Sequence, residues 1–158
     1  MNRFYIHVLA LVALSTVTCT EGKDADWQWL AGDTHIHSHW SPGYDRTVSP
    51  PTPIQGGDAN YSTPTNASQA RNYGLSWMVT TDHGGPNHAK FNLSQAYPEL
   101  KTSRTLVPDV LQFYGMELNM PSMDHHTLIV PHSEEEASVL FDIERQFDAR
   151  EAWPEDPT

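Results

Sequence analysis

The stretch Asp33-Thr34-His35-Ile36-His37-Ser38 places two histidines one residue apart, where an expected strand runs into a loop. Side chains alternate between the two faces of a strand, so both imidazoles are expected on the same face. Two neighbouring nitrogen donors can share one divalent ion, and imidazole combined with carboxylate suits zinc, manganese or iron. His35 and His37 therefore predict part of a metal site, with Asp33 placed to orient an imidazole.

A second polar cluster, Asp82-His83, ends the apolar run 75–81 and precedes the turn Gly84-Gly85-Pro86. The run is partly β-branched, which is typical of a buried strand. Polar groups at the end of a buried strand are costly unless they serve a site. We expect His83 to be a metal ligand, and Asp82 either to join it or to hydrogen-bond a ligand imidazole.

A third cluster combines Glu117, which follows the apolar run 110–116, with His125 and His126, which precede the short run 128–130. A carboxylate at a strand end can bridge two cations about 3.5–4 Å apart. Strand alternation lets only one of two adjacent histidines face the cavity, and His125 is the preferred ligand.

Three other histidines are weaker candidates. We expect His39 on the loop after the first strand and His88 on the surface, and His132 is a weak candidate ligand.

The strands alternate with segments that are expected to be helical: 66–73, 91–104 with a bend near Pro98, and 134–149. In the last segment Val139, Ile143 and Phe147 have the spacing of an apolar helix face. Such alternation predicts an α/β fold with a parallel sheet surrounded by helices. Polar clusters at the carboxyl ends of strands are typical of barrel enzymes, and four strands make half of such a barrel.

The segment 41–65 is rich in proline and glycine and long for a loop, so we expect it to wall a substrate site. The chain of 158 residues has room for one domain. Its 9 Lys and Arg against 20 Asp and Glu give a net charge of −11. An acidic chain is a poor candidate for nucleic-acid binding, which needs a basic patch, so no such patch is expected.

Residues 1–20 have the pattern of an export signal, because a positive start is followed by an apolar run too short to span a bilayer. The one cysteine, Cys19, follows that run. It suggests either a lipoprotein signal with a lipid on Cys19 or plain cleavage nearby. The expected location is periplasmic, secreted or lipid-anchored, with membrane contact only through that lipid.

Three motifs and one histidine together resemble the PHP family (polymerase and histidinol phosphatase domain) over residues 32–132; they are Asp33-Thr34-His35-Ile36-His37-Ser38, Thr81-Asp82-His83, Gly115-Met116-Glu117 and His125. The resemblance implies a partial distorted (β/α)₇ TIM-like barrel that binds two or three divalent ions, often zinc or manganese. It also implies hydrolysis of a small-molecule or polymeric phosphoester by a metal-bound hydroxide.

By the same resemblance, His35 and His37 would hold one ion and His83 a second. Glu117 would bridge the ions, and His125 would complete another position. The family often has a His or Asp soon after the His-x-His pair, and here Asp45 or His39 would have to substitute at an unusual spacing.

The family's closing motifs, a further His and an Asp-x-His, have no counterpart after His132. Residues 27–158 are therefore expected to be the N-terminal portion of such a domain. Two alternatives stay open. One is an inert fragment or metal-binding module that lacks the last ligands. The other is an amidohydrolase-like metal hydrolase, although Lys90 and Lys101 fall outside the expected strands.

Overall fold

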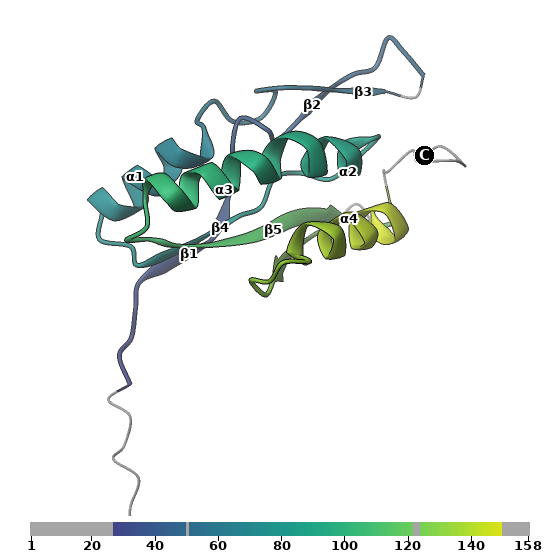
Figure 1. Cartoon of the computed structure of the whole chain (residues 1–158). Coiled ribbons are helices and arrows are strands. Elements are labelled where there is room, and N and C mark those ends of the chain that lie inside the picture. Colours follow the sequence, from purple (N-terminus) through teal and green to yellow (C-terminus); the bar gives the residue numbers. More distant parts are fainter. Residues whose placement is uncertain (1–26, 50, 122–123, 150–158) are drawn as a thin grey trace, which may run out of the picture.

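The computed structural model describes residues 27–49, 51–121 and 124–149. This part of the chain has a mixed α/β fold around a curled four-stranded sheet, an open half-barrel (Figure 1). The strands follow the spatial order β1 (Gly32–Ile36), β4 (Trp77–Thr80), β5 (Leu111–Asn119) and β6 (His125–Val130). The α/β class and the partial-barrel shape agree with the sequence-based prediction.

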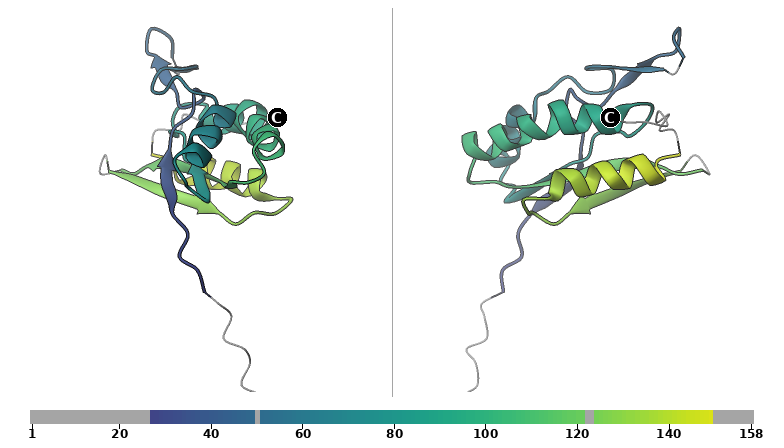
Figure 2. Two further views of the ribbon diagram at one scale, coloured as in Figure 1. Left: turned by 90° about the vertical axis from the view of Figure 1, so that its left-hand side faces the viewer. Right: turned by 45° about the vertical axis from the view of Figure 1, so that its right-hand side comes forward.

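The helices lie on one face of this sheet, as the views in Figure 2 show. They are α1 (Thr63–Asn72), α2 (His88–Phe91), the π-helical stretch η1 (Asn92–Ala96), α3 (Tyr97–Leu106) and α4 (Glu136–Phe147). The predicted irregularity near Pro98 takes the form of η1, which ends at Ala96, two residues before that proline. Proline lacks the N–H that an α-helix would use there, and wider helical turns often relieve such a mismatch.

Two of the three strand pairings in the four-stranded sheet are parallel, as predicted, but the third is not. β1 pairs with β4 and β4 with β5 in parallel, whereas β5 and β6 are antiparallel. A parallel crossover needs a dozen or more residues, and residues 120–124 leave room only for a hairpin. Both strands are also longer than expected, because β5 continues to Asn119 and β6 already begins at His125.

Two apolar clusters hold the helices on the sheet. Leu100 from α3, Met116 from β5 and Leu140 from α4 belong to the larger cluster, and all three are almost fully buried. Ala67 from α1 and Met78 from β4 belong to the smaller one. The strand ends that follow these packed segments are therefore fixed in position.

The buried face of α4 differs from the prediction. Val139 and Phe147 are 42% and 62% exposed, so the predicted apolar stripe does not face the core. The helix instead buries Leu140 and Glu144. Glu144 turns inward because its carboxylate pairs with a buried histidine of α2, 3.2 Å away.

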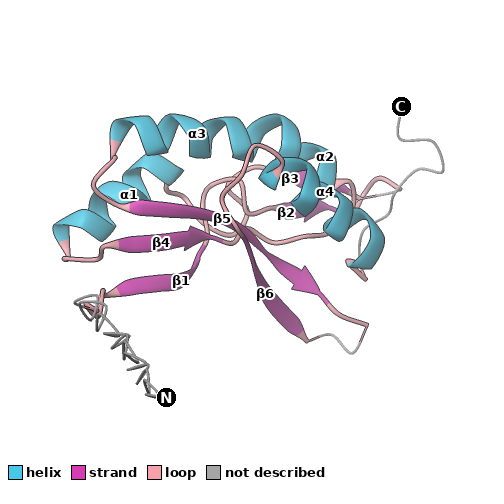
Figure 3. Cartoon of the chain, turned by 60° about the horizontal axis from the view of Figure 1, so that its bottom comes forward, coloured by secondary structure: helices cyan, strands magenta, loops and turns pink. Residues whose placement is uncertain are grey.

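The other face of the sheet is not covered by helices among the described residues (Figure 3). A hollow of about 320 Å³ lies there, lined by Trp77, Val79, Leu111, Phe113 and Ile129. In a closed barrel this face would line the interior.

The predicted loop 41–65 contains a small antiparallel hairpin of β2 (Gly43–Asp45) and β3 (Thr52–Ile54). After it the chain enters α1 at Thr63, earlier than predicted. The Ser62 hydroxyl accepts a hydrogen bond from the Thr65 amide at 3.3 Å, which caps the helix start.

The predicted export signal, residues 1–20 with Cys19, lies outside the described residues. Within the part that is described, none of the helices combines the length and apolar character needed to cross a bilayer.

Candidate metal centre

The structure brings together all five residues that the sequence singles out. They lie at the carboxyl ends of β1, β4 and β5 and at the start of β6: His35, His37, His83, Glu117 and His125. Their ligand atoms form overlapping groups in which all atoms lie within 4.8 Å of one another. Asp58, which the sequence analysis did not single out, belongs to one of these groups.

Glu117 lies at the centre of the cluster. Its Oε2 is 3.2 Å from Nε2 of His35, 2.8 Å from Nε2 of His37 and 3.6 Å from Nδ1 of His83. Its other oxygen, Oε1, contacts Nδ1 of His125. One carboxylate, only 9% exposed, therefore faces four imidazoles that come from three places in the sheet: the end of β1, the segment after β4 and the start of β6.

Backbone pairing places His83 beside Glu117. After β4 ends, Glu117 donates its amide to the Asp82 carbonyl and the Gly84 amide donates to the Glu117 carbonyl, both at 3.0 Å. His83 therefore continues the ladder with β5. The sequence predicts a buried strand that ends at Asp82-His83; β4 ends earlier, at Thr80, and His83 pairs with Glu117 as an isolated bridge.

The hairpin register selects His125 over its neighbour His126. Glu117 lies opposite Thr127 and Asn119 lies opposite His125. His125 and Thr127 are two residues apart and share the face that carries Glu117, whereas His126 faces the other way. Thr127 also contacts Nδ1 of His35 through its hydroxyl at 2.9 Å, which turns the other nitrogen of His35 toward Glu117.

Asp58 approaches the cluster from the segment after β3. Its Oδ2 contacts Nδ1 of His37 and lies 3.7 Å from Nε2 of His83. Ser41 donates its hydroxyl to the same oxygen at 3.1 Å and accepts the backbone amide of His83 at 3.1 Å. Neither Asp45 nor His39, the two residues considered for this place, lies in the cluster: the Asp45 carboxylate accepts hydrogen bonds from Thr47.

His39, the other expected substitute, lies on the loop after β1, as predicted. Its Nε2 bonds Glu99 at 2.7 Å.

Burial and charge tune the groups of the cluster in a consistent direction. Burial lowers the pKa of His83 below its ordinary value, although Glu117 opposes the shift. Partial burial raises the pKa of Glu117, but the hydrogen bond from His125 and the nearby imidazoles outweigh it, so this pKa lies below its ordinary value. A neutral imidazole and an ionised carboxylate are the forms that bind a metal.

Two aspartates that precede the ligand motifs have roles other than the predicted ones. Asp82 is fully buried and accepts two hydrogen bonds from Ser38, from the amide at 2.6 Å and from the hydroxyl at 2.8 Å. Asp33 accepts the backbone amide of His35 at 3.0 Å, not its imidazole. Both carboxylates therefore accept backbone amides of the segment that carries the His-x-His pair and hold its backbone in place.

The remaining histidines lie outside the cluster. His88 is fully buried, which contradicts the predicted surface position. Its ring contacts Glu144 and the Trp40 carbonyl, each at 3.2 Å. His132 is largely exposed and contacts Glu136 of α4 at 3.2 Å.

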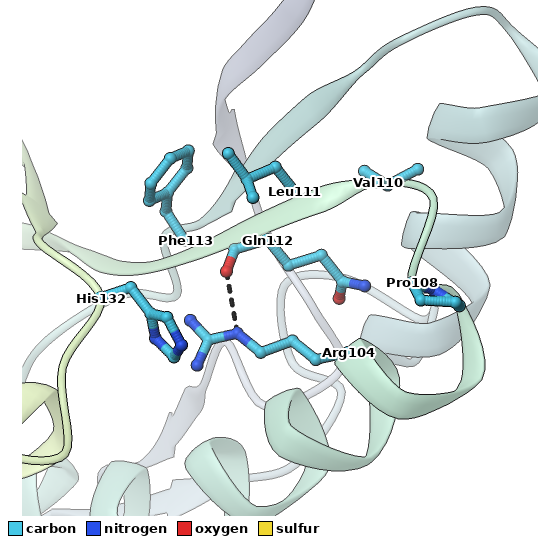
Figure 4. A pocket seen from close by; sticks show the side chains of 7 residues that line it. All are labelled: Arg104, Pro108, Val110, Leu111, Gln112, Phe113 and His132. Carbon is cyan, nitrogen blue, oxygen red and sulfur yellow. Dashed lines mark hydrogen bonds between the residues drawn. The ribbon is translucent and has the colours of Figure 1, made fainter.

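A separate hollow of about 180 Å³ lies at the amino end of β5 (Figure 4). Arg104 reaches into it beside His132, but the guanidinium already bonds the Gln112 carbonyl at 2.9 Å and the buried Glu136. Because this cation is neutralised within the fold, the hollow gives no second polar centre.

The donor set fits a divalent metal. Zinc–nitrogen bonds of about 2.0–2.1 Å place the ligand atoms of a tetrahedral site about 3.3 Å apart. The separations around Glu117, from 2.8 to 3.6 Å, span that value. Four imidazoles around one carboxylate would repel one another if all were protonated, whereas neutral rings with a shared cation would not.

No family model matches this chain, and neither a curated protein nor a solved structure shows significant similarity to it. The functional inference therefore depends on the geometry of the cluster.

Proposed function

We propose that this chain is a metal-dependent hydrolase of the PHP type that acts on phosphoesters. The observation that carries the proposal is the Glu117 carboxylate, which lies among four imidazoles from the end of β1, the segment after β4 and the start of β6. A single carboxylate in such a position is suited to join two cations, as in the two-metal sites of phosphatases and nucleases.

The two oxygens of Glu117 suggest how the donors divide. Oε2 lies nearest to Nε2 of His37 and His35, so these two imidazoles and Oε2 would hold one ion. Oε1 contacts His125, and His83 presents Nδ1 to the same carboxylate, so these groups would hold the second ion.

Asp58 would orient two of the rings from outside. It contacts Nδ1 of His37, the nitrogen that faces away from Glu117, and it lies close to the outer nitrogen of His83. A ligand histidine commonly donates its second N–H to a carboxylate in this way, which fixes the ring and makes the metal-binding nitrogen more basic.

Divalent ions, when bound, supply the Lewis acidity that activates water and neutralises charge on phosphoryl oxygens. The residues of the chain hold the donors in place before substrate arrives. Ser41 and Asp82 fix the loop around His37, and the ladder with β5 fixes His83. This preorganisation lowers the cost of assembling the site.

The curled sheet suits a partial (β/α)₇ barrel, because the proposed site lies at the carboxyl ends of its parallel strands. An amidohydrolase-like site is less well supported. Such a site would use a lysine on a middle strand, whereas Lys101 lies on α3 with its ammonium 5.0 Å from the centre of the Tyr97 ring. We also propose that residues 1–20 direct export.

The test compares three proteins: the wild type, the double variant His35→Ala with His37→Ala, and His126→Ala as the control. His126 lies on the same strand as His125 but faces away from the cluster. Each protein is purified with zinc or manganese, its metal content is measured by plasma mass spectrometry, and hydrolysis of a phosphomonoester and a phosphodiester is followed.

We expect about two ions per chain and hydrolysis of one ester in the wild type and the control, and neither in the double variant. Bound metal without hydrolysis of any ester would leave a metal-binding module in place of an enzyme. Less than about 0.2 ion per chain in the wild type would refute the metal centre itself.

A further inference from the structure

A hollow of about 270 Å³ lies between the β2–β3 hairpin and the turn that follows His83. Tyr44, Arg46, Pro51 and Pro86 line it. Three of these side chains offer flat or compact apolar surfaces, and one carries a permanent positive charge. The volume is slightly below the usual 300–1,000 Å³ of ligand pockets, so the hollow suits one small ring better than a long polymer.

The hairpin that forms this hollow is attached directly to the candidate metal centre. The Tyr44 hydroxyl donates to the Gly84 carbonyl at 2.8 Å, one residue after His83. Gly85 has φ +143°, and a Cβ added to it would lie 2.0 Å from the Tyr44 hydroxyl oxygen. Only glycine therefore allows the tyrosine to approach this closely.

The segment that follows β3 also packs closely against the hairpin. A Cβ on Gly57 would lie 2.0 Å from the backbone nitrogen of Gly43 at the start of β2. The next residue is Asp58, which contacts His37. The hairpin is therefore connected to the cluster through Tyr44 of β2 and through Asp58 after β3. The hollow borders the segment that carries His83.

Arg46 is the charged group of this hollow. It is exposed, and among the described residues it forms no ion pair, although the whole chain has a net charge of −11. Arg104, by contrast, pairs with Glu136. A free guanidinium beside apolar walls is suited to bind a carboxylate or phosphate in a forked geometry.

We propose that this hollow is a substrate subsite that binds an aromatic ring bearing a second anionic group, next to the phosphoester at the metal centre. Arg46 pairs with the anionic group, and the ring packs against Tyr44 and the two prolines. The substrate class is a small aryl-type phosphomonoester with an additional negative charge. This inference rests on the proposed phosphoesterase function.

The test uses two substrates of nearly equal shape, 4-carboxyphenyl phosphate and 4-carbamoylphenyl phosphate; the second has a neutral amide in place of the carboxylate. Their kcat/KM values are measured for the wild type, Arg46→Gln, Arg46→Lys and Arg71→Gln. Arg71 is the control because it lies in the last turn of α1, which leads to the amino end of β4.

We expect the wild type and Arg71→Gln to prefer the carboxylate substrate about three- to tenfold, the range that suits a forked but exposed ion pair. Arg46→Gln loses this preference, because its kcat/KM on the carboxylate substrate falls toward its kcat/KM on the carbamoyl substrate. Arg46→Lys keeps part of it, because lysine retains the charge without the fork. Equal kcat/KM ratios in the wild type and Arg46→Gln would overturn the subsite and leave the proposed function in place.

A binding measurement separates the two proposals. The non-hydrolysable 4-carboxyphenyl and 4-carbamoylphenyl phosphonates are titrated calorimetrically into the manganese-loaded wild type and Arg46→Gln. If neither phosphate is hydrolysed but the carboxylate phosphonate binds more tightly only when Arg46 is present, the phosphoesterase function fails and the subsite stands. If both phosphonates bind equally to the wild type, the subsite is refuted.

Discussion

Asp58 provides the sharpest test of the candidate metal centre, because the change to Asn alters the charge and keeps the shape. Its Oδ2 contacts Nδ1 of His37 and lies 3.7 Å from His83, while the Glu117 side of both rings is left free for metal. If Asp58 orients these imidazoles, Asp58→Asn weakens metal binding without removing a ligand. Changes to such outer carboxylates typically cost about 10- to 100-fold in metal affinity.

The lower end of this range applies here. The Asp58 side chain is 36% exposed, so solvent screens its charge, and asparagine still offers an oxygen to accept the hydrogen bond from His37. We therefore expect the affinity to fall about tenfold, which corresponds to about 1.4 kcal/mol. The number of ions bound at saturation stays the same.

The assay is a competition titration of zinc or manganese against a chromophoric chelator at pH 7.5. Asp45→Asn is the matched control, because Asp45 lies on the β2–β3 hairpin, near Asp58 in the sequence, and among the described residues its carboxylate bonds its near neighbour Thr47. An unchanged affinity in Asp58→Asn would refute the orienting role. Loss of one ion per chain would also refute it, since Asp58 would then be a ligand. An equal loss in Asp45→Asn would indicate a general effect of charge.

Three further results are expected. Metal affinity falls as the pH drops, because protons compete with the metal for the ligands. Burial holds the pKa of His83 below its ordinary value. In chelator-treated protein, the ring resonances of His83 should therefore titrate below pH 6.5 when followed by NMR. Glu144→Ala leaves the fully buried His88 without its carboxylate and costs about 3–5 kcal/mol of unfolding free energy in urea. Gly85→Ala forces Tyr44 and its hairpin away and costs about 1–3 kcal/mol by the same measurement.

Each of these three predictions has a result that would contradict it, and the two stability predictions also have a control variant. Glu135→Ala removes an exposed carboxylate from the start of the same helix as Glu144, and it should change stability by less than about 0.5 kcal/mol. Gly74→Ala tests a positive φ of +81° where the added Cβ meets no atom, so a loss as large as that of Gly85→Ala would refute the steric argument. A His83 ring that titrates above pH 6.5 would contradict the effect of burial, and a loss below about 1 kcal/mol in Glu144→Ala would contradict the buried pair.

The tertiary structure alone decided how α4 packs and where His88 lies. Hydrophobic spacing predicted that Val139 and Phe147 would face the core, yet both are exposed. Burying a charged Glu144 is unfavourable by itself, and it becomes acceptable only because the His88 ring, 56 positions earlier, is there to pair with it. No local pattern contains that information. The apolar periodicity therefore predicted that a helix forms, but not which of its faces is buried.

Asp58 illustrates the same limit at the candidate site. Nothing in the polar, glycine-rich stretch around it distinguishes this carboxylate from Asp45, and only the hairpin brings it to His37. The antiparallel direction of β6 could have been predicted from the sequence, because the connection at 120–124 is too short for a crossover. That direction sets the register that turns Thr127 toward His35.

The sequence by itself determined the α/β alternation of the main strands and helices and the polar residues near the strand ends: His35, His37, His83, Glu117 and His125. Those features follow from local periodicity, because a strand fixes which side chains share a face. The tertiary structure decided which of these groups meet, which carboxylates orient them, and which helix face is buried. These depend on contacts between residues far apart in the chain, where the cost of burying charge is settled by partners that no local pattern specifies.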